Sequence, residues 1–275
     1  MRLATIRTPN GLQAVRIDGD VAVECGAPDV GALLARADWR DSAVNADGPR
    51  HDVDALVYAP VVPSPGKIIC VGLNYRTHIT EMGRDLPQYP TLFAKFPEVL
   101  IGPHDALVLP AESDAVDWEA ELAVVIGTSV RRADEQTARE AIAGYTIMND
   151  VSMRDWQFRT REWLQGKNFE ASAPFGPHLV TPDEVPANAA ISSTVDGEVM
   201  QSSSIRDLLF GPAELVAYIS TIITLHPGDV IATGTTGGVG HARTPQRYLQ
   251  PGQTLVTSIE GIGQAVTPVR GSEKG

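Results

Sequence analysis

The chain has 275 residues, of which 43% are hydrophobic and 20% are charged. This length suffices for an ample hydrophobic core in one large domain, or in one large and one small domain. The composition is that of an ordinary globular protein, which excludes a disordered chain. Lysine and arginine minus aspartate and glutamate is 22 − 34 = −12, so the chain is poorly suited to bind nucleic acid or an anionic membrane surface.

The 25 glycines and 20 prolines predict many turns and a β-rich fold, in which the first sixty residues form a small separate unit. Turn residues separate three short strands in this unit, at residues 3–7, 12–17 and 21–23. A short helix is predicted at 30–37, and the proline-rich stretch 60–66 is the predicted linker. The expected domains are therefore 1–62 and 63–275.

Beyond the linker, apolar runs of strand length predict a second set of strands. They lie at residues 67–72, 92–95, 106–109, 118–126, 144–150, 178–181, 230–233 and 255–259, with a hairpin turn at 195–198. The polar segment 74–90, here named the lid segment, contains Gly83, Pro87 and Pro90. It is predicted to be a mobile connection with one short helical turn.

Two helices are expected in this second part. Asp134 can cap the first, which would end at Gly144. The second begins near Pro212, and its apolar side chains recur with the helical period, which predicts a stripe that faces the core. The stripe consists of Leu215, Val216, Ile219, Ile222 and Ile223. The sequence His226-Pro227-Gly228 ends this helix.

Glu119 and Glu121 are two residues apart in a predicted strand, so their side chains point to the same side. Two carboxylates in a low-dielectric place repel each other, and a hard divalent cation such as Mg²⁺, Mn²⁺ or Ca²⁺ would stabilise both. Asp150, at the end of another apolar strand, is a candidate third ligand. A solvated strand face for the glutamates and a turn or helix cap for Asp150 are the alternatives.

His78 and Glu81 would share one face of a helical turn. A carboxylate beside an imidazole orients its tautomer and raises its basicity, which suits a general base that activates water. The alternative is a surface histidine near a glutamate. Lys167 is either a cation for the substrate or a surface lysine.

The glycine-rich stretch Thr233 to Gly240 follows a strand, so its backbone N–H groups could bind a carboxylate or an oxyanion. It lacks the spacing of a nucleotide-binding loop. Cys25 and Cys70 are predicted to be reduced and buried. The first seven residues lack a signal-peptide core, and the apolar stretch 215–225 is shorter than the about 20 residues of a membrane span, so a cytoplasmic location is expected.

Six blocks of sequence, in this order, resemble the fumarylacetoacetate hydrolase superfamily. They are GLNYRTHITEMG (72–83), LFAKFP (92–97), DWEAELAVVIG (117–127), YTIMNDVSMRDWQ (145–157), GKNFEASAPFGP (166–177) and TGTTGGVG (233–240). The resemblance extends from about Lys67 to Arg270. Thr236 departs from the family pattern, in which a proline commonly follows the second threonine of the last block.

The resemblance implies a β-rich α+β protein. Its catalytic domain would be a mixed β-sandwich or roll, preceded by a small N-terminal α+β domain, and the protein would be a homodimer. Glu119, Glu121 and Asp150 match the family's metal ligands, normally for Mg²⁺ or Mn²⁺, with Ca²⁺ able to occupy the site in vitro. His78 and Glu81 match a catalytic pair carried on a lid. Further matching positions are Lys167, as a third catalytic residue, and the substrate contacts Lys95, Arg154, Gln157, Gly234 and Thr235.

The implied reaction is hydrolysis of a C–C bond in a 2,4-dioxo acid, an acylpyruvate such as fumarylpyruvate or acetylpyruvate. Pyruvate and a carboxylic acid would form through a metal-stabilised enolate, in a role such as aromatic catabolism. The alternatives on the same metal site are decarboxylation of oxaloacetate and isomerisation of 2-hydroxyhepta-2,4-diene-1,7-dioate. A non-catalytic metal-binding domain is a more distant alternative, because such a domain would need neither His78 nor Glu81.

Overall fold

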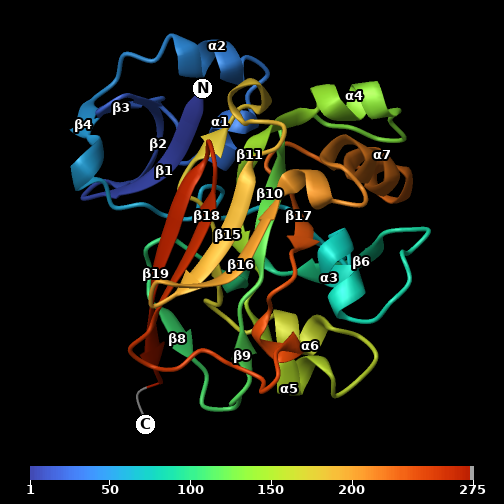
Figure 1. The fold of residues 1–275 in the computed structure, drawn as a ribbon. Helices are drawn as coiled ribbons and strands as arrows, with labels where there is room; N and C mark the ends of the chain where they lie inside the picture. The colour runs from blue at the N-terminus through green and yellow to red at the C-terminus, as the bar shows by residue number, and fades with distance from the viewer. Residues whose placement is uncertain (273–275) are drawn as a thin grey trace.

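Two β-sheets packed face to face form the centre of the computed structural model, which describes residues 1–272 (Figure 1). The larger sheet has ten strands in the order β4-β3-β2-β1-β14-β11-β10-β17-β5-β6, and the smaller has five in the order β16-β15-β18-β19-β8. The larger sheet is mixed, because β17 and β5 run parallel while its other neighbouring strands are antiparallel. This architecture confirms the predicted β-rich fold class.

The strands of the larger sheet are β1 (Arg2–Thr8), β2 (Gly11–Asp18), β3 (Val21–Glu24), β4 (Arg50–Asp52), β5 (Ile68–Gly72), β6 (Thr91–Lys95), β10 (Ala120–Ile126), β11 (Ile142–Asn149), β14 (Leu179–Val180) and β17 (Val230–Thr235). Those of the smaller sheet are β8 (Leu107–Leu109), β15 (Ala190–Val195), β16 (Glu198–Ser204), β18 (Thr254–Ile259) and β19 (Gly263–Gly271). Two short pairs join β12 (Ser152–Met153) to β9 (Val116–Asp117) and β13 (Ala173–Pro174) to β7 (Leu100–Ile101).

The α-helices are short and lie around the sheets (Figure 1). They are α1 (Val30–Leu34), α2 (Trp39–Val44), α3 (Arg76–Glu81), α4 (Glu135–Glu140), α5 (Arg154–Gln157), α6 (Leu164–Lys167) and α7 (Pro212–Ile222). No helix within residues 1–272 is long and apolar enough to cross a membrane.

Strand β10 shows how alternation of side chains divides the molecule. Ala120 and Leu122 are fully buried between the two sheets, where they belong to one core cluster with Ile191 of β15 and Ile259 of β18. The intervening residues point to the opposite face. There, Ala123 belongs to a second core cluster that contains much of the N-terminal region. Glu119 and Glu121 lie on that same face, next to this core.

Residues 1–62 continue the larger sheet, since β1 pairs with β14 at Arg2–Val180 and Leu3–Leu179. Strands β1 to β3 agree with the three predicted strands. The division of the chain near residue 62 stays a prediction. Cys25 and Cys70 are both buried and unpaired, as expected.

Two details of the predicted helices are wrong. The helix capped by Asp134 ends at Glu140, because the carbonyl oxygen of Ala141 accepts a hydrogen bond from Gly127 and β11 begins with the next residue. In α7, Leu215, Val216 and Ile219 are buried, but the final Ile222 is 61% exposed and Ile223, just beyond the helix, is 43% exposed. The stripe therefore faces the core only along the first two turns.

Candidate metal centre and active site

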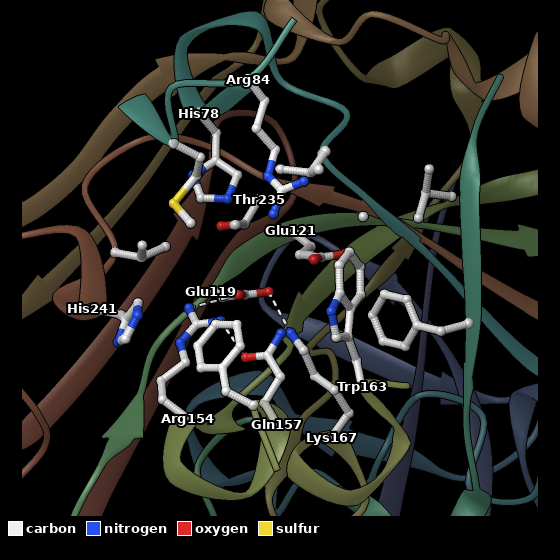
Figure 2. A pocket seen from close by; sticks show the side chains of 17 residues that line it. His78, Arg84, Glu119, Glu121, Arg154, Gln157, Trp163, Lys167, Thr235 and His241 are labelled. Atoms are coloured by element: carbon white, nitrogen blue, oxygen red, sulfur yellow. Dashed lines mark hydrogen bonds and ion pairs between the residues drawn. The ribbon is translucent and has the colours of Figure 1, made fainter. Parts of the chain in front are cut away.

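One pocket opens where β10 begins and β17 ends, between the lid segment and α5–α6 (Figure 2). Glu119 and Glu121 lie at its floor and His78 on its wall. The antiparallel pairing of β10 and β11 places Ala120 opposite Asn149, so Asp150 follows β11 directly beside the start of β10. The backbone N–H of Asp150 donates a 2.9 Å hydrogen bond to the carbonyl oxygen of Glu119.

Glu119, Glu121 and Asp150, here named the carboxylate cluster, are all buried. They offer carboxylate oxygens that lie within 4.8 Å of one another. The structure thus assembles the three predicted metal ligands from two strands. Three hard oxygen donors at this spacing suit a divalent cation of the Mg²⁺ or Mn²⁺ type.

Two buried lysines hold part of the cluster. Lys167 Nζ lies 2.7 Å from Glu119 Oε2 and 2.8 Å from Asp150 Oδ2. Lys95 Nζ lies 2.7 Å from Asp150 Oδ1 and also donates to the carbonyl oxygen of Lys167. Both lysines are 2% exposed, so their attraction to the neighbouring carboxylates is little screened by water.

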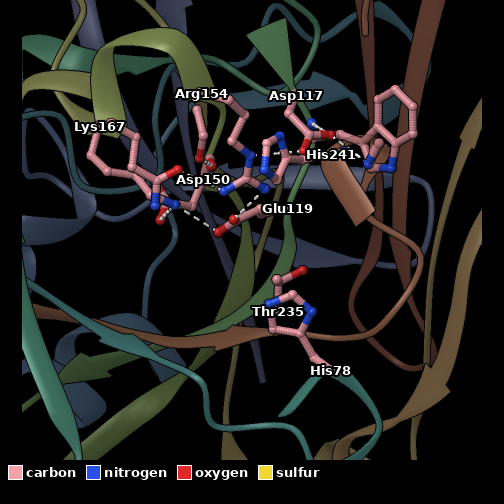
Figure 3. A network of polar contacts seen from close by, with 12 residues as sticks. His78, Asp117, Glu119, Asp150, Arg154, Lys167, Thr235 and His241 are labelled. Atoms are coloured by element: carbon pink, nitrogen blue, oxygen red, sulfur yellow. Dashed lines mark hydrogen bonds and ion pairs between the residues drawn. The ribbon is translucent and has the colours of Figure 1, made fainter. Parts of the chain in front are cut away.

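Arg154 links the cluster to a second network (Figure 3). Its guanidinium lies 2.7 Å from Glu119 and 2.8 Å from Asp117, and it donates to Gln157 Oε1 at 2.8 Å. Asp117 also accepts hydrogen bonds from the backbone N–H groups of Gly240 and His241. One fully buried carboxylate therefore fixes both Arg154 and the loop that follows β17.

The pKa values of the cluster diverge because their charges are unequally compensated. Burial raises the pKa of Glu119, but the charges of Lys167 and Arg154 outweigh burial and lower it to about 2. Burial raises the pKa of Glu121 well above its usual value, and the charges of Asp150 and Glu119 raise it further. The carboxylate of Glu121 accepts a 2.8 Å hydrogen bond from the backbone N–H of Gly234.

The charge count supports a divalent cation. Four buried carboxylates, those of the cluster and Asp117, stand against three buried cations, which leaves 3 − 4 = −1. The cations are Lys95, Arg154 and Lys167. An ionised Glu121 without a cationic partner is costly to bury, and a bound divalent cation would remove that cost.

The predicted pair on the lid segment is also brought to the pocket. His78, which is 7% exposed, lies on α3 with its Nδ1 3.3 Å from Glu81 Oε2. Glu81 in turn accepts hydrogen bonds from the backbone N–H of Gly238 at 3.0 and 3.1 Å. This contact joins the lid segment to the glycine-rich loop and leaves the other face of the imidazole toward the pocket (Figure 2).

Backbone N–H groups of the glycine-rich loop bind carboxylates of the protein itself. Gly234 has φ +100°, and its N–H donates to Glu121, so this group supports the carboxylate cluster. Thr235 lines the pocket, but its hydroxyl donates to the carbonyl oxygen of Ala120 and accepts from Gln201 Nε2. Substrate contact by Gly234 and Thr235 stays a prediction.

Close packing of α5 on α6 places Lys167. A Cβ atom on Gly166 would lie 2.4 Å from the backbone nitrogen of Gln157, so only glycine permits this approach. Lys167 and Gln157 then both line the pocket with Arg154, and their predicted catalytic and substrate-binding roles stay predictions. Lys95 lies behind Lys167 and is not among the residues that line the pocket.

Several pocket residues were missed by sequence reasoning. His241 follows the glycine-rich loop directly, which was the one available signal, and its ring stacks near Phe158 at 5.0 Å. Trp163 packs edge to face with Phe93 at 5.5 Å and forms an apolar wall. Arg84 lines the pocket from the lid segment, whereas Gln201 of the smaller sheet lies outside the lining and donates to the pocket residue Thr235. Neither has a local sequence signal.

Comparisons with known proteins identify the family to which the chain is similar. Residues 67–270 match the sequence profile described as Fumarylacetoacetate (FAA) hydrolase C-terminal. The chain is 43% identical over 224 residues to "Oxaloacetate tautomerase Fahd2a, mitochondrial" of Rattus norvegicus, covering 80% of this chain and 71% of that protein. It is 42% identical over 227 residues to the "Fumarylacetoacetate hydrolase domain-containing protein 2 homolog" of Dictyostelium discoideum, covering 78% and 74%.

Two solved structures share the whole architecture. One is the fumarylacetoacetate hydrolase of psychrophilic Exiguobacterium antarcticum, with a TM-score of 0.89 and 32% identity over 99% of this chain and 100% of that chain. The other is the 5-carboxymethyl-2-hydroxymuconate delta-isomerase of Mycobacterium smegmatis, with a TM-score of 0.84 and 35% identity over 100% of both chains. Both likenesses include the N-terminal region, which the family profile does not cover.

Proposed function

Because the chain belongs to the fumarylacetoacetate hydrolase family, we propose that it is a divalent-metal-dependent enzyme that interconverts the keto and enol forms of oxaloacetate. The observation that carries this proposal is the buried carboxylate cluster, because its members Glu119 and Glu121 line the same pocket as His78. A 2-oxo acid supplies oxygen donors for a cation held at the cluster, and its C3 carries the proton that an imidazole can remove. The relatives named as oxaloacetate tautomerases support this choice of substrate.

Glu119, Glu121 and Asp150 would hold the cation, and a bound Mg²⁺ or Mn²⁺ supplies Lewis-acid polarisation of the C2 oxygen. Lys167 Nζ, 2.7 Å from Glu119, would supply a second positive charge next to the cluster. Charge that develops on the C2 oxygen is stabilised in a site from which water is largely excluded, where fixed charges act most strongly.

His78 is the proposed proton carrier. Its Nδ1 faces Glu81, which holds the ring in one tautomer with Nε2 free to accept a proton. In the enol direction, the C3–H bond breaks, the proton moves to Nε2 and then to the C2 oxygen, and the C2–C3 bond becomes double. Atoms and charge balance without water or another reactant.

Hydrolysis of an acylpyruvate is the second candidate function, and the Glu81–His78 pair favours it. The same imidazole could take a proton from water, which would then attack the distal carbonyl and release pyruvate and a carboxylic acid. Isomerisation is a further alternative, because one of the similar structures is named as a 5-carboxymethyl-2-hydroxymuconate delta-isomerase. Decarboxylation of oxaloacetate would use the same cluster.

A side-by-side assay tests the proposal. Metal-stripped protein would be given oxaloacetate, acetylpyruvate or fumarylpyruvate, with and without Mg²⁺ or Mn²⁺. Enol loss is followed by ultraviolet absorbance, and pyruvate, carboxylic acid and CO₂ are quantified. Metal-dependent acceleration of oxaloacetate tautomerisation is the expected result. Acid release from an acylpyruvate, with tautomerisation at the uncatalysed rate, would replace the tautomerase by the hydrolase.

We also propose that the protein acts as a homodimer in the cytoplasm. The two buried, unpaired cysteines suit a reducing compartment, although several relatives are named as mitochondrial proteins. A role in aromatic catabolism remains a proposal of the same kind. Light scattering of the purified protein would measure the oligomeric state.

A further inference from the structure

We propose that Arg84 binds the distal carboxylate of a 2-oxo dicarboxylate and thereby selects dicarboxylates over monocarboxylates. This inference rests on the proposed function, because it assigns the end of the substrate that does not reach the carboxylate cluster. Arg84 lines the same pocket as Glu119, Glu121 and Lys167. Figure 2 shows its side chain reaching from the lid segment into the pocket beside His78.

The end of α3 determines where Arg84 lies. Gly83 has φ +64° and donates its N–H to the carbonyl oxygen of Thr80 at 2.9 Å. The N–H of Arg84 donates to the carbonyl oxygen of Ile79 at 3.1 Å. These two bonds are the paired contacts of a Schellman motif, which ends a helix and turns the chain back across its last turn. His78 and Arg84 are thereby both placed at the pocket by the same end of α3.

The other cations around the cluster are already engaged. Lys95 and Lys167 are bonded to Asp150 and Glu119, and Arg154 is bonded to Asp117, Glu119 and Gln157. The guanidinium of Arg84, in contrast, forms no hydrogen bond or ion pair with any of residues 1–272. It is therefore the cation of this pocket that can pair with a ligand without breaking an internal contact.

The charge count points to the same role. The buried groups sum to −1, a divalent cation brings them to +1, and the chelating carboxylate of a 2-oxo acid brings the total to zero. A second carboxylate would then lie uncompensated beside the apolar wall of Trp163 and Phe93. Arg84 supplies the missing positive charge, and its planar fork matches a carboxylate with two parallel hydrogen bonds.

Substitution of Arg84 tests this assignment through the ratio of two KM values, one for a diacid and one for its monoester. The KM of oxaloacetate is compared with that of its 4-methyl ester, which has the same skeleton but lacks the distal charge. In Arg84→Met, we expect the preference for the diacid to fall by about 10- to 100-fold, the range of a charge-assisted hydrogen bond. Arg84→Lys should restore part of the preference. Arg50→Met, on the distant β4, is the matched control and should keep the wild-type ratio.

A binding measurement separates this inference from the proposed reaction. With Mg²⁺ present, calorimetry gives the Kd of oxaloacetate and of pyruvate, which lacks the distal carboxylate. Selective loss of oxaloacetate affinity in Arg84→Met supports the assignment even if the wild type shows no tautomerase activity. If the wild type tautomerises oxaloacetate and Arg84→Met keeps both the KM ratio and the Kd ratio, the assignment is overturned while the proposed function stands.

Discussion

The carboxylate of Glu121 accepts a 2.8 Å hydrogen bond from the backbone N–H of Gly234, and it forms no ion pair with any of residues 1–272. Glu119 and Asp150, its neighbours in the cluster, each have two cationic partners. The negative charges of Glu119 and Asp150 are thus balanced by neighbouring cations, whereas the charge of an ionised Glu121 is not. A divalent cation would therefore be stabilised most strongly next to Glu121.

Glu121→Gln should weaken metal binding while preserving the shape of the site. The amide keeps an oxygen acceptor for Gly234 but removes one negative charge. Mutation of groups that merely support a metal ligand costs about 10- to 100-fold in affinity, so we expect a loss of more than about 100-fold for Mn²⁺. Calorimetric titration of the metal-stripped variant and wild type with Mn²⁺ measures both affinities. An affinity equal to that of the wild type would remove Glu121 from the ligand set.

The same variant should change how stability depends on pH without metal. Burial, Asp150 and Glu119 raise the pKa of Glu121 in the folded state above its ordinary value of 4.5. The folded protein then holds a proton that the unfolded chain has lost, so the contribution of Glu121 to stability falls as pH rises through that window. The free energy of unfolding of Glu121→Gln should therefore rise relative to that of the wild type as pH rises from 4.5 toward neutrality. Urea unfolding of both proteins at several pH values measures this change. A stability difference between them that does not depend on pH would contradict the prediction.

His78→Ala should retain metal binding and lose turnover. Removal of a general base typically costs about 10²- to 10⁴-fold in rate. His226→Ala is the matched control, because His226 is exposed and lies outside the pocket. Rates of oxaloacetate tautomerisation and Mn²⁺ affinities would be measured for both variants. Turnover near the wild-type value in His78→Ala would make the proton-carrier assignment wrong.

Gly166→Ala should disturb the site through packing alone. The new methyl group would meet the backbone nitrogen and Cα of Gln157 at 2.4 and 2.6 Å, so α5 and α6 must separate and Lys167 must move. We expect a destabilisation of about 1–3 kcal/mol together with reduced activity. Gly211→Ala is the control, since no atom lies within 4 Å of its added Cβ. Equal effects of the two substitutions would contradict this account.

Asp117→Ala should be the most destabilising of these changes. It removes one carboxylate partner of the buried Arg154 and the acceptor for the N–H groups of Gly240 and His241. Breaking a buried ion pair from one side costs about 3–5 kcal/mol, which urea unfolding can measure. Asp114→Ala, at an exposed position, should change stability by less than about 0.5 kcal/mol. A loss below about 1 kcal/mol in Asp117→Ala would show that Arg154 is held by other groups.

The features that could be predicted from sequence are those that depend on local geometry. Glu119 and Glu121 share a strand face because side chains alternate, and His78 meets Glu81 because helical neighbours three apart do. Asp150 was predictable as a strand-end carboxylate. Its meeting with Glu119 depends on the pairing of β10 with β11, which only the resemblance implied.

The rest of the site depends on long-range contacts or on the tertiary path of a loop. Gln201 holds Thr235 from the smaller sheet, and no local pattern links strands that far apart in the sequence. Arg84 reaches the pocket because of the Schellman turn at Gly83, although the sequence around it is that of an ordinary polar connection. Ile222 has the apolar periodicity of a buried position but is exposed. Helical periodicity does not show where a helix extends past the core that it packs against.

One measurement tests the central claim most directly. Mn²⁺ is titrated into metal-stripped protein, and bound metal and the rate of oxaloacetate tautomerisation are measured in the same samples. The account predicts one Mn²⁺ per chain, with the rate rising in proportion to occupancy and both lost together in Glu121→Gln. Full activity in the metal-stripped protein, or stoichiometric Mn²⁺ binding without any tautomerisation, would contradict it.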